Sequence, residues 1–319
     1  MPDKMHMERV IKDFSNIFIF HQFKLQIILI LIAAFIISGC ENSKYKNMNA
    51  KVNSEMENVN ENISGYAPVN GLKMYYEIHG YGFPLVLIHG GGSTIESNFG
   101  RVIDELAKTH KVIAVEMQAH GRTADIDRPL SFEQDADDIA ALIRYLNIEK
   151  ADIFGFSNGA STTLQCAIRH PELVNKIVVA STIYKKSGTP PWFWDMMNKA
   201  SFEGMPQPLK DSFLKLNPDT NALYRMYERD VKRMQTFTDI PDEQMRSITA
   251  PALIITGDAD VATPEHAAEM HSILSGSRLA IIPGGHGDYI GEITTSQDSI
   301  LINATVHMIN KFLNEPLTK

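Results

Sequence analysis

Cysteine is almost absent from this sequence, because 319 residues contain only Cys40 and Cys166. Two cysteines supply neither a disulfide framework nor a zinc-binding spacing, so a small fold held together by either is excluded. Long basic runs are also absent and the formal net charge is -8. We therefore expect no nucleic-acid partner. The 44% hydrophobic and 21% charged residues are typical of a globular protein with a sizeable core.

Charged side chains are missing from the stretch 25–39, an apolar run interrupted by Gln26. Its length suits the central region of a signal peptide and is short for a membrane-spanning helix. The run ends at Ile37-Ser38-Gly39-Cys40, which resembles the lipobox of bacterial lipoproteins, where the cysteine is lipidated and becomes the mature N-terminus. We expect residues 1–39 to be a signal peptide and the protein to be exported and anchored to a membrane of the bacterial cell envelope through Cys40. An uncleaved anchor with an incidental cysteine is the alternative.

Apolar residues are scarce between residues 41 and 64, a segment rich in Asn, Lys, Glu and Ser. Such a segment cannot bury enough apolar surface to order itself. We expect residues 40–65 to form a flexible tether and residues 66–319 to form the folded domain.

Short apolar runs alternate with helical patterns from about residue 66. The runs predict buried strands at 85–88, 112–115, 151–154, 177–180, 252–256 and 279–282, with an edge strand or hairpin at 72–78. Helices are expected at 99–108, after a capping box at 131–134, after residue 157, at 264–274 and near the C-terminus. This alternation predicts an α/β fold with a mostly parallel sheet covered by helices on both faces. The part at about 183–248 lacks a buried strand and predicts a small helical lid.

Ligands of such sheets bind beyond the carboxyl ends of the strands. Four polar loops directly follow predicted strands: the loops at His89, Ser157, Asp258 to Asp260, and His286. We therefore expect these loops to converge at one edge of the sheet.

The second of these loops reads Gly155-Phe156-Ser157-Asn158-Gly159 and joins a predicted strand to a predicted helix. A G-x-S-x-G turn in this context exposes its serine above the sheet as a nucleophile. The turn also places the backbone N–H of Asn158 at a helix N-terminus, where negative charge is favoured. Ser157 is the predicted nucleophile.

An aspartate and then a histidine follow Ser157 along the chain at later strand ends, at Asp258 or Asp260 and at His286. The stretches 89–92 (HGGG), 155–159 (GFSNG), 257–260 (GDAD) and 284–287 (GGHG) carry a resemblance to the α/β-hydrolase superfamily over about residues 66–315. The chain looks closest to the carboxylesterase and haloperoxidase-like branch. The resemblance implies an α/β-hydrolase fold with a Ser-His-Asp triad and no metal or cofactor.

His286 is the expected base, because it follows the last strand between glycines. Asp260 is the expected third member, since the family pattern places the acid three residues after the glycine, and Asp258 is its rival. Backbone N–H groups of Asn158 and Gly91 are expected to form the oxyanion hole, with Gly92 as an alternative to Gly91.

The predicted reaction is hydrolysis of an ester, thioester or lactone of a small molecule through an acyl-enzyme. Alternatives are a C–C bond or amide hydrolase of the same superfamily, or a binding or sensing module with little turnover. Trp192, Trp194 and Met197 are expected either to wall the substrate pocket or to pack the lid onto the domain. The pattern at 226–234 is expected to face the core.

Overall fold

The computed structural model describes residues 63–316, and the statements below concern these residues. The expected signal peptide, Cys40 and the tether up to residue 62 lie outside the described residues. Within residues 63–316, no helix combines the length and the apolar character needed to cross a bilayer.

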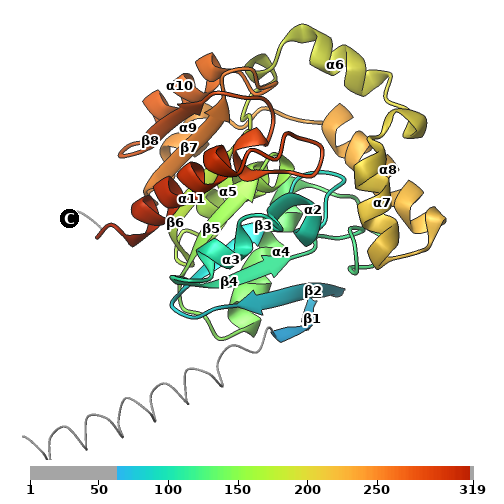
Figure 1. Ribbon diagram of the computed structural model, residues 1–319, viewed down its shortest axis with the longest axis horizontal. Helices are drawn as coiled ribbons and strands as arrows, with labels where there is room; N and C mark the ends of the chain where they lie inside the picture. Colours follow the sequence, from blue (N-terminus) through green and yellow to red (C-terminus); the bar gives the residue numbers. More distant parts are fainter. Residues whose placement is uncertain (1–62, 317–319) are drawn as a thin grey trace, which may run out of the picture. The chain divides into compact units, whose positions relative to one another are not determined.

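A mostly parallel sheet forms the centre of the domain (Figure 1), with the strand order β1-β2-β4-β3-β5-β6-β7-β8. The strands are β1 (Ile63–Val69), β2 (Leu72–His79), β3 (Phe83–Ile88), β4 (His110–Val115), β5 (Ala151–Phe156), β6 (Val174–Ala180), β7 (Ala252–Gly257) and β8 (Arg278–Ile282). The hairpin β1-β2 joins β4 in antiparallel register, and all later pairs are parallel. Every predicted strand is confirmed. β1 begins at Ile63, slightly before the domain boundary expected at residue 66.

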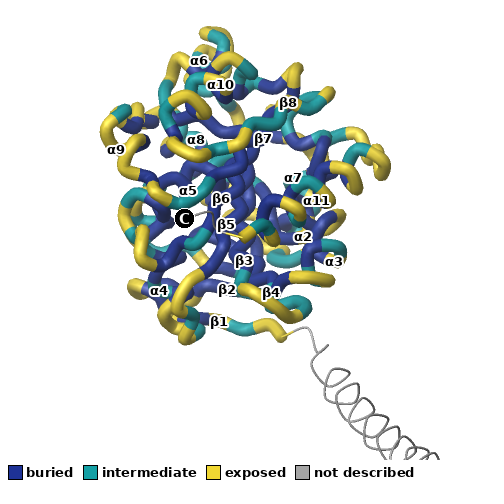
Figure 2. Tube along the Cα trace, turned by 90° about the vertical axis from the view of Figure 1, so that its left-hand side faces the viewer, coloured by how far each residue is buried: buried dark blue, intermediate teal, exposed yellow. Residues whose placement is uncertain are grey.

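The sheet separates two apolar cores. Side chains alternate along a strand, so Val86 and Ile88 of β3 contribute to one core, and Leu85 and Leu87 contribute to the other. One core is covered by α4 (Phe132–Tyr145), α5 (Asn158–Arg169) and α10 (Pro264–Ile273), and the other by α2 (Ile95–Phe99), α3 (Ile103–Leu106) and α11 (Ser299–Asn314). Figure 2 shows the central strands as the continuous buried part of the domain. The predicted fold class is thereby confirmed.

Two helix predictions differ in detail from the structure. The helix expected at 99–108 is replaced by α2 and α3, because Thr94 caps α2 early and Gly100 ends it. The capping box expected at Ser131 is only half formed. The Ser131 hydroxyl accepts from Gln134 N at 3.1 Å, whereas the Gln134 side chain donates to Asp138.

The insert between β6 and β7 contains helices and no strand along its whole described length. Its helices are α6 (Pro191–Asn198), α7 (Gln207–Leu216), α8 (Thr220–Gln235) and α9 (Asp242–Arg246). Figure 1 shows α6, α7 and α8 above the carboxyl ends of the parallel strands. By contrast, Met245 of α9 belongs to the core that α4, α5 and α10 cover. The lid is therefore the part of the insert before α9.

Candidate active site

Ser157 occupies a strained turn between β5 and α5. Its backbone φ is 54° and ψ is -119°, values that a serine rarely adopts without support from its surroundings. The two flanking glycines provide the necessary space. A Cβ at Gly155 would lie 2.2 Å from the carbonyl oxygen of Gly159, and a Cβ at Gly159 would lie 2.0 Å from that of Ile88. Close approach of α5 to the sheet therefore requires glycine at both positions.

A chain of hydrogen bonds leads from Ser157 to His286 and on to Asp260. The serine hydroxyl lies 3.1 Å from His286 Nε2, and His286 Nδ1 lies 2.8 Å from Asp260 Oδ1. A carboxylate only accepts hydrogen bonds, so Nδ1 carries a proton. Nε2 of the neutral ring is then free to accept the serine proton. This is the geometry of a Ser-His-Asp triad.

Asp260 and Asp258 occupy different environments although they are close in sequence. Asp260 is buried, and its carboxylate accepts from Ala262 N at 3.0 Å and from the Ser181 hydroxyl as well as from His286. Burial alone would raise its pKa, but the neighbouring His286 and these hydrogen bonds outweigh burial and lower it. Asp258 is exposed and accepts from Gly284 N at 2.8 Å. The structure therefore places Asp260, and not Asp258, against His286.

The same pair sets the pKa of His286. Burial among protein atoms lowers it, but the charge and hydrogen bond of Asp260 raise it more, so the net shift is upward. The ring also lies against Phe156, with 4.8 Å between the ring centroids. These contacts fix the orientation of the imidazole.

The expected oxyanion residues Gly91 and Asn158 line the same cavity as Ser157 and His286. The backbone N–H of Gly92 donates to Asp230 Oδ2 at 2.6 Å. Gly92 is therefore already engaged, which leaves Gly91 as the donor that this loop can offer to a ligand.

This cavity has a volume of about 670 Å³ and lies between the strand ends and the lid. Its lid wall is rich in methionine, with Met196, Met197, Met205, Met226 and Met234 among the lining residues. Flexible thioether side chains suit an adaptable apolar pocket. The expectation that 226–234 faces the core holds for Met226, which is fully buried in an apolar cluster, but Met226 and Met234 of the same helix also line the cavity.

The three aromatic and methionine residues proposed for the pocket separate in the structure. Met197 lines the cavity, and Trp192 and Trp194 do not. Trp192 is 53% exposed. Trp194 packs on Phe237, with ring centroids 5.7 Å apart, and donates from Nε1 to the carbonyl of Lys186. Of the two tryptophans, therefore, only Trp194 packs the lid onto the rest of the chain.

Sequence reasoning missed two polar residues of the site. Ser181 directly follows β6 and has a φ of 52°, so its place at the strand ends could have been inferred. Asp230 lies in the middle of α8, lines the cavity and is buried. The sequence gives little indication that Asp230 belongs to the site, because acidic residues are common on exposed helix faces.

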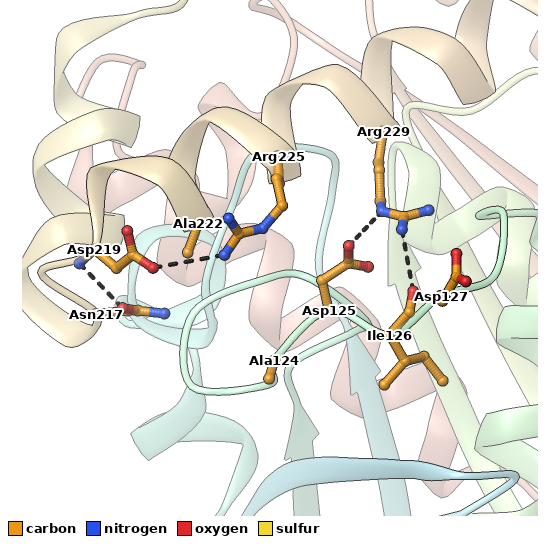
Figure 3. A pocket seen from close by; sticks show the side chains of 9 residues that line it. All are labelled: Ala124, Asp125, Ile126, Asp127, Asn217, Asp219, Ala222, Arg225 and Arg229. Atoms are coloured by element: carbon orange, nitrogen blue, oxygen red, sulfur yellow. Dashed lines mark hydrogen bonds and ion pairs between the residues drawn. The ribbon is translucent and has the colours of Figure 1, made fainter.

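A second cavity, of about 460 Å³, lies between α8 and the loop at 124–127 (Figure 3). Arg225 and Arg229 line it from the helix, and Asp125 lines it from the loop. Its lining contains no serine, cysteine or histidine, so it offers no nucleophile and base. The hydrogen-bonded pair of Ser157 and His286 lines the first cavity instead.

Comparison with known proteins agrees with this geometry. The alpha/beta hydrolase fold family matches residues 84–224. Human serine hydrolase BPHL is 30% identical over 240 residues, which cover 70% of this chain and 79% of that protein. The chain belongs to the α/β-hydrolase family. A second relative, the 2-hydroxymuconate semialdehyde hydrolase of Pseudomonas sp. strain CF600, is 36% identical over 115 residues, or 34% of this chain and 40% of that enzyme.

Solved structures of other hydrolases superpose on most of this α/β hydrolase. A serine hydrolase of carbazole degradation, CarC, superposes with a TM-score of 0.64 at 25% identity, covering 79% of this chain and 100% of that one. The enol-lactonase of Burkholderia xenovorans LB400 superposes with a TM-score of 0.61 at 23% identity, covering 78% and 100%. Three of these four relatives are named as hydrolases and the fourth as an enol-lactonase.

Proposed function

We propose that this α/β hydrolase cleaves an ester, thioester or lactone of an apolar small molecule, with Ser157 as nucleophile, His286 as base and Asp260 as the acid that orients it. The observation that carries the proposal is the hydrogen-bond chain from Ser157 through His286 to Asp260 at the floor of the cavity.

Acylation begins when Ser157 attacks the carbonyl carbon of the substrate. His286 Nε2 takes the hydroxyl proton, and Asp260 stabilises the resulting imidazolium. The carbonyl oxygen becomes an oxyanion, which the backbone N–H groups of Gly91 and Asn158 stabilise. Loss of one such donor costs about 2.7–4 kcal/mol in the barrier. His286 then gives its proton to the leaving oxygen or sulfur.

Deacylation repeats these steps with water. His286 removes a proton from the water as it attacks the acyl-enzyme, and returns that proton to Ser157. The acid product leaves and the site is restored. The proposal needs no metal or cofactor.

The test is hydrolysis of p-nitrophenyl esters from acetate to palmitate by the full chain, with Ser157→Ala as the control. We expect activity that is lost in the variant, together with labelling of Ser157 by a fluorophosphonate. Equal rates in both proteins, or no labelling of Ser157, would contradict serine hydrolysis and favour the binding or sensing role.

Cleavage of a C–C bond beside a ketone is the second candidate. It is supported by the relative named for 2-hydroxymuconate semialdehyde and by one named for a 2-hydroxy-6-oxo-hexadienoic acid, 34% identical over 120 residues. The same Ser157-His286 pair would serve this reaction. Rapid turnover of a 2-hydroxy-6-oxo-dienoate with poor turnover of every ester would favour it over the ester proposal.

We also propose export and anchoring through a lipid on Cys40, on the basis of the lipobox-like sequence alone. Cys40→Ala should release the protein from the membrane fraction or block its maturation. Unchanged mass and fractionation of the variant would contradict the anchor.

A further inference from the structure

The lid reaches the oxyanion loop through one buried carboxylate. Asp230 Oδ2, on α8, accepts the backbone N–H of Gly92 at 2.6 Å. A Cβ built at Gly91 would lie 3.2 Å from the same oxygen and 2.5 Å from Asn158 Nδ2. The proposed oxyanion donor Gly91 is therefore held between the residue after the nucleophile and a side chain of the lid.

A buried histidine neutralises this carboxylate on one side. His120 Nε2 lies 2.9 Å from Asp230 Oδ2, and His120 Nδ1 lies 2.9 Å from the carbonyl oxygen of Gln118. Both partners are acceptors, so both ring nitrogens carry protons and His120 is an imidazolium. A longer contact of 3.3 Å from Gly92 N to Nε2 is secondary to the bond that Gly92 makes with Asp230. The pKa of His120 is raised, because the attraction of Asp230 outweighs the effect of burial.

An arginine neutralises Asp230 on the other side and connects it to the domain. Arg233, one turn further along α8, donates to Asp230 Oδ1 at 2.5 Å and to Asp135 of α4 at 2.7 Å. Asp135, His120, Asp230 and Arg233 are all buried. Two cations thus pair with two carboxylates across the boundary between lid and domain. His120 of the domain bonds to Asp230 of the lid, and Arg233 of the lid bonds to Asp135 of the domain.

A second arginine, one turn before Arg233 on α8, also bonds to the domain. Figure 3 shows Arg229 above the loop at 124–127, where its Nε donates to Asp125 at 2.6 Å and another guanidinium nitrogen donates to the carbonyl of Ile126 at 3.1 Å. Because Arg229 and Arg233 both bond α8 to the domain, the position of Asp230 relative to Gly92 is defined by the domain.

We propose that Asp230 is a positioning residue of the hydrolase, which sets the Gly91-Gly92 loop so that the Gly91 N–H faces the nascent oxyanion. The inference rests on the proposed function, since it assumes attack by Ser157. On this proposal, helix α8 both lines the pocket and positions the oxyanion loop.

The charges explain why a carboxylate is tolerated beside an oxyanion hole. An uncompensated carboxylate near Gly91 would repel the developing negative charge. His120 and Arg233 cancel that charge, while the carboxylate oxygen still accepts the Gly92 N–H. Asp230 therefore fixes the loop without opposing the reaction, as a preorganised site requires.

The test compares the full-length protein with Asp230→Asn, Asp230→Glu and the control Glu228→Gln. Asp230→Asn removes the charge, and Asp230→Glu keeps the charge but displaces the carboxylate, so at least one variant remains informative if the other fails to fold. Glu228 is exposed on the same helix, and its replacement removes the same charge. We expect kcat to fall at least about 10-fold in both Asp230 variants, within the 10²–10³-fold limit for losing a donor, while KM changes less than about 2-fold. The control should match the unchanged protein.

Two inhibitors separate positioning from general damage to the lid. A trifluoromethyl ketone forms an oxyanion with Ser157, whereas the corresponding alcohol only fills the cavity. Loss of affinity for the ketone alone is expected. Equal loss for both inhibitors, or an unchanged kcat in the Asp230 variants of an active enzyme, would overturn the positioning role. If the unchanged protein neither hydrolyses esters nor binds the ketone, the proposed function fails and the role of Asp230 fails with it.

Discussion

At the scale of single residues, chemically identical side chains differ in burial and in hydrogen-bond partners, and these differences define the site. Asp258 and Asp260 are two positions apart, yet only Asp260 is buried and bonded to His286. His89 and His120 contrast in the same way. His89 donates from Nδ1 to the carbonyl of Gly90 and accepts from Met117 N, so it is neutral, and burial lowers its pKa to about 3. His120 faces two acceptors and is charged.

The Asp260–His286 pair predicts a definite pH profile. A base must be unprotonated, so kcat/KM should rise with pH, with a midpoint above the ordinary histidine value of about 6.5 because Asp260 raises the pKa of His286. Asp260→Asn should lower kcat by about 10⁴-fold, because it destabilises the required tautomer, and should move the midpoint to lower pH. Steady-state kinetics from pH 5 to 9 would measure both effects.

Asp258→Asn is the matched control for this prediction. Asp258 is exposed and accepts from Gly284 N in the loop, away from His286, so its replacement should leave the midpoint in place and change kcat little. A larger loss in Asp258→Asn than in Asp260→Asn would contradict the assignment.

Residue chemistry was predictable wherever a sequence pattern places a residue at a strand end. Ser157, His286 and Asp260 each follow a parallel strand, so topology alone brings them to one edge. Asp230 follows no strand. Its place beside Gly92 depends on how α8 packs across the domain, which is a long-range property that spacing within the helix does not encode.

At the scale of elements, the lid shows the limit of composition as a guide. The aromatic cluster of α6 left open whether it walls the pocket or packs the lid onto the domain, and the structure divides the two roles: Met197 lines the cavity, whereas the two tryptophans do not. The helical period of α8 predicted an apolar face correctly. It did not reveal that this face meets a cavity as well as a core.

The lid geometry predicts that only one of two large-to-small substitutions in α6 changes the ester preference. Met197→Ala should enlarge the cavity and shift the ester preference towards acyl chains longer by one or two methylenes, each contributing about 0.8 kcal/mol when buried. Trp192→Ala should leave the preference unchanged, because this side chain is 53% exposed and does not line the cavity. The ratio of kcat/KM along a p-nitrophenyl ester series gives the answer. A shift in Trp192→Ala but not in Met197→Ala would refute this description of the pocket.

At the scale of the whole molecule, the stability of the domain depends on carboxyl groups placed inside it. Asp152 on β5 is 1% exposed and accepts from Asn175 Nδ2 at 2.7 Å. Burial raises its pKa to about 6, more than the bond from Asn175 lowers it. Between the unfolded pKa of 3.8 and this value, the unfolded state binds fewer protons, so the native state loses stability as the pH rises.

Asp152→Asn should therefore gain stability relative to the unchanged protein as the pH rises from 4 to 7, by up to about 3 kcal/mol. The asparagine keeps the acceptor for Asn175 and cannot ionise. Urea unfolding at several pH values measures the difference. Asp137→Asn is the control. Hydrogen bonds from Arg169 and His170 lower the pKa of Asp137, so its ionised form stabilises the native state, and this contribution to the free energy of unfolding no longer changes above about pH 5. A parallel pH dependence in the two variants would contradict the prediction.

The link between Asp230 and the oxyanion loop has a consequence for the ancestry of such enzymes. The lid is one continuous segment, and recombination could exchange it between homologues as a cassette. A transplanted lid would give the recipient domain a pocket of new shape. It would also need an acidic residue that accepts the Gly92 N–H and an arginine that donates to Asp135. Chimeras that ignore this pairing should bind new ligands yet turn them over slowly, so lid and domain are expected to evolve as partners.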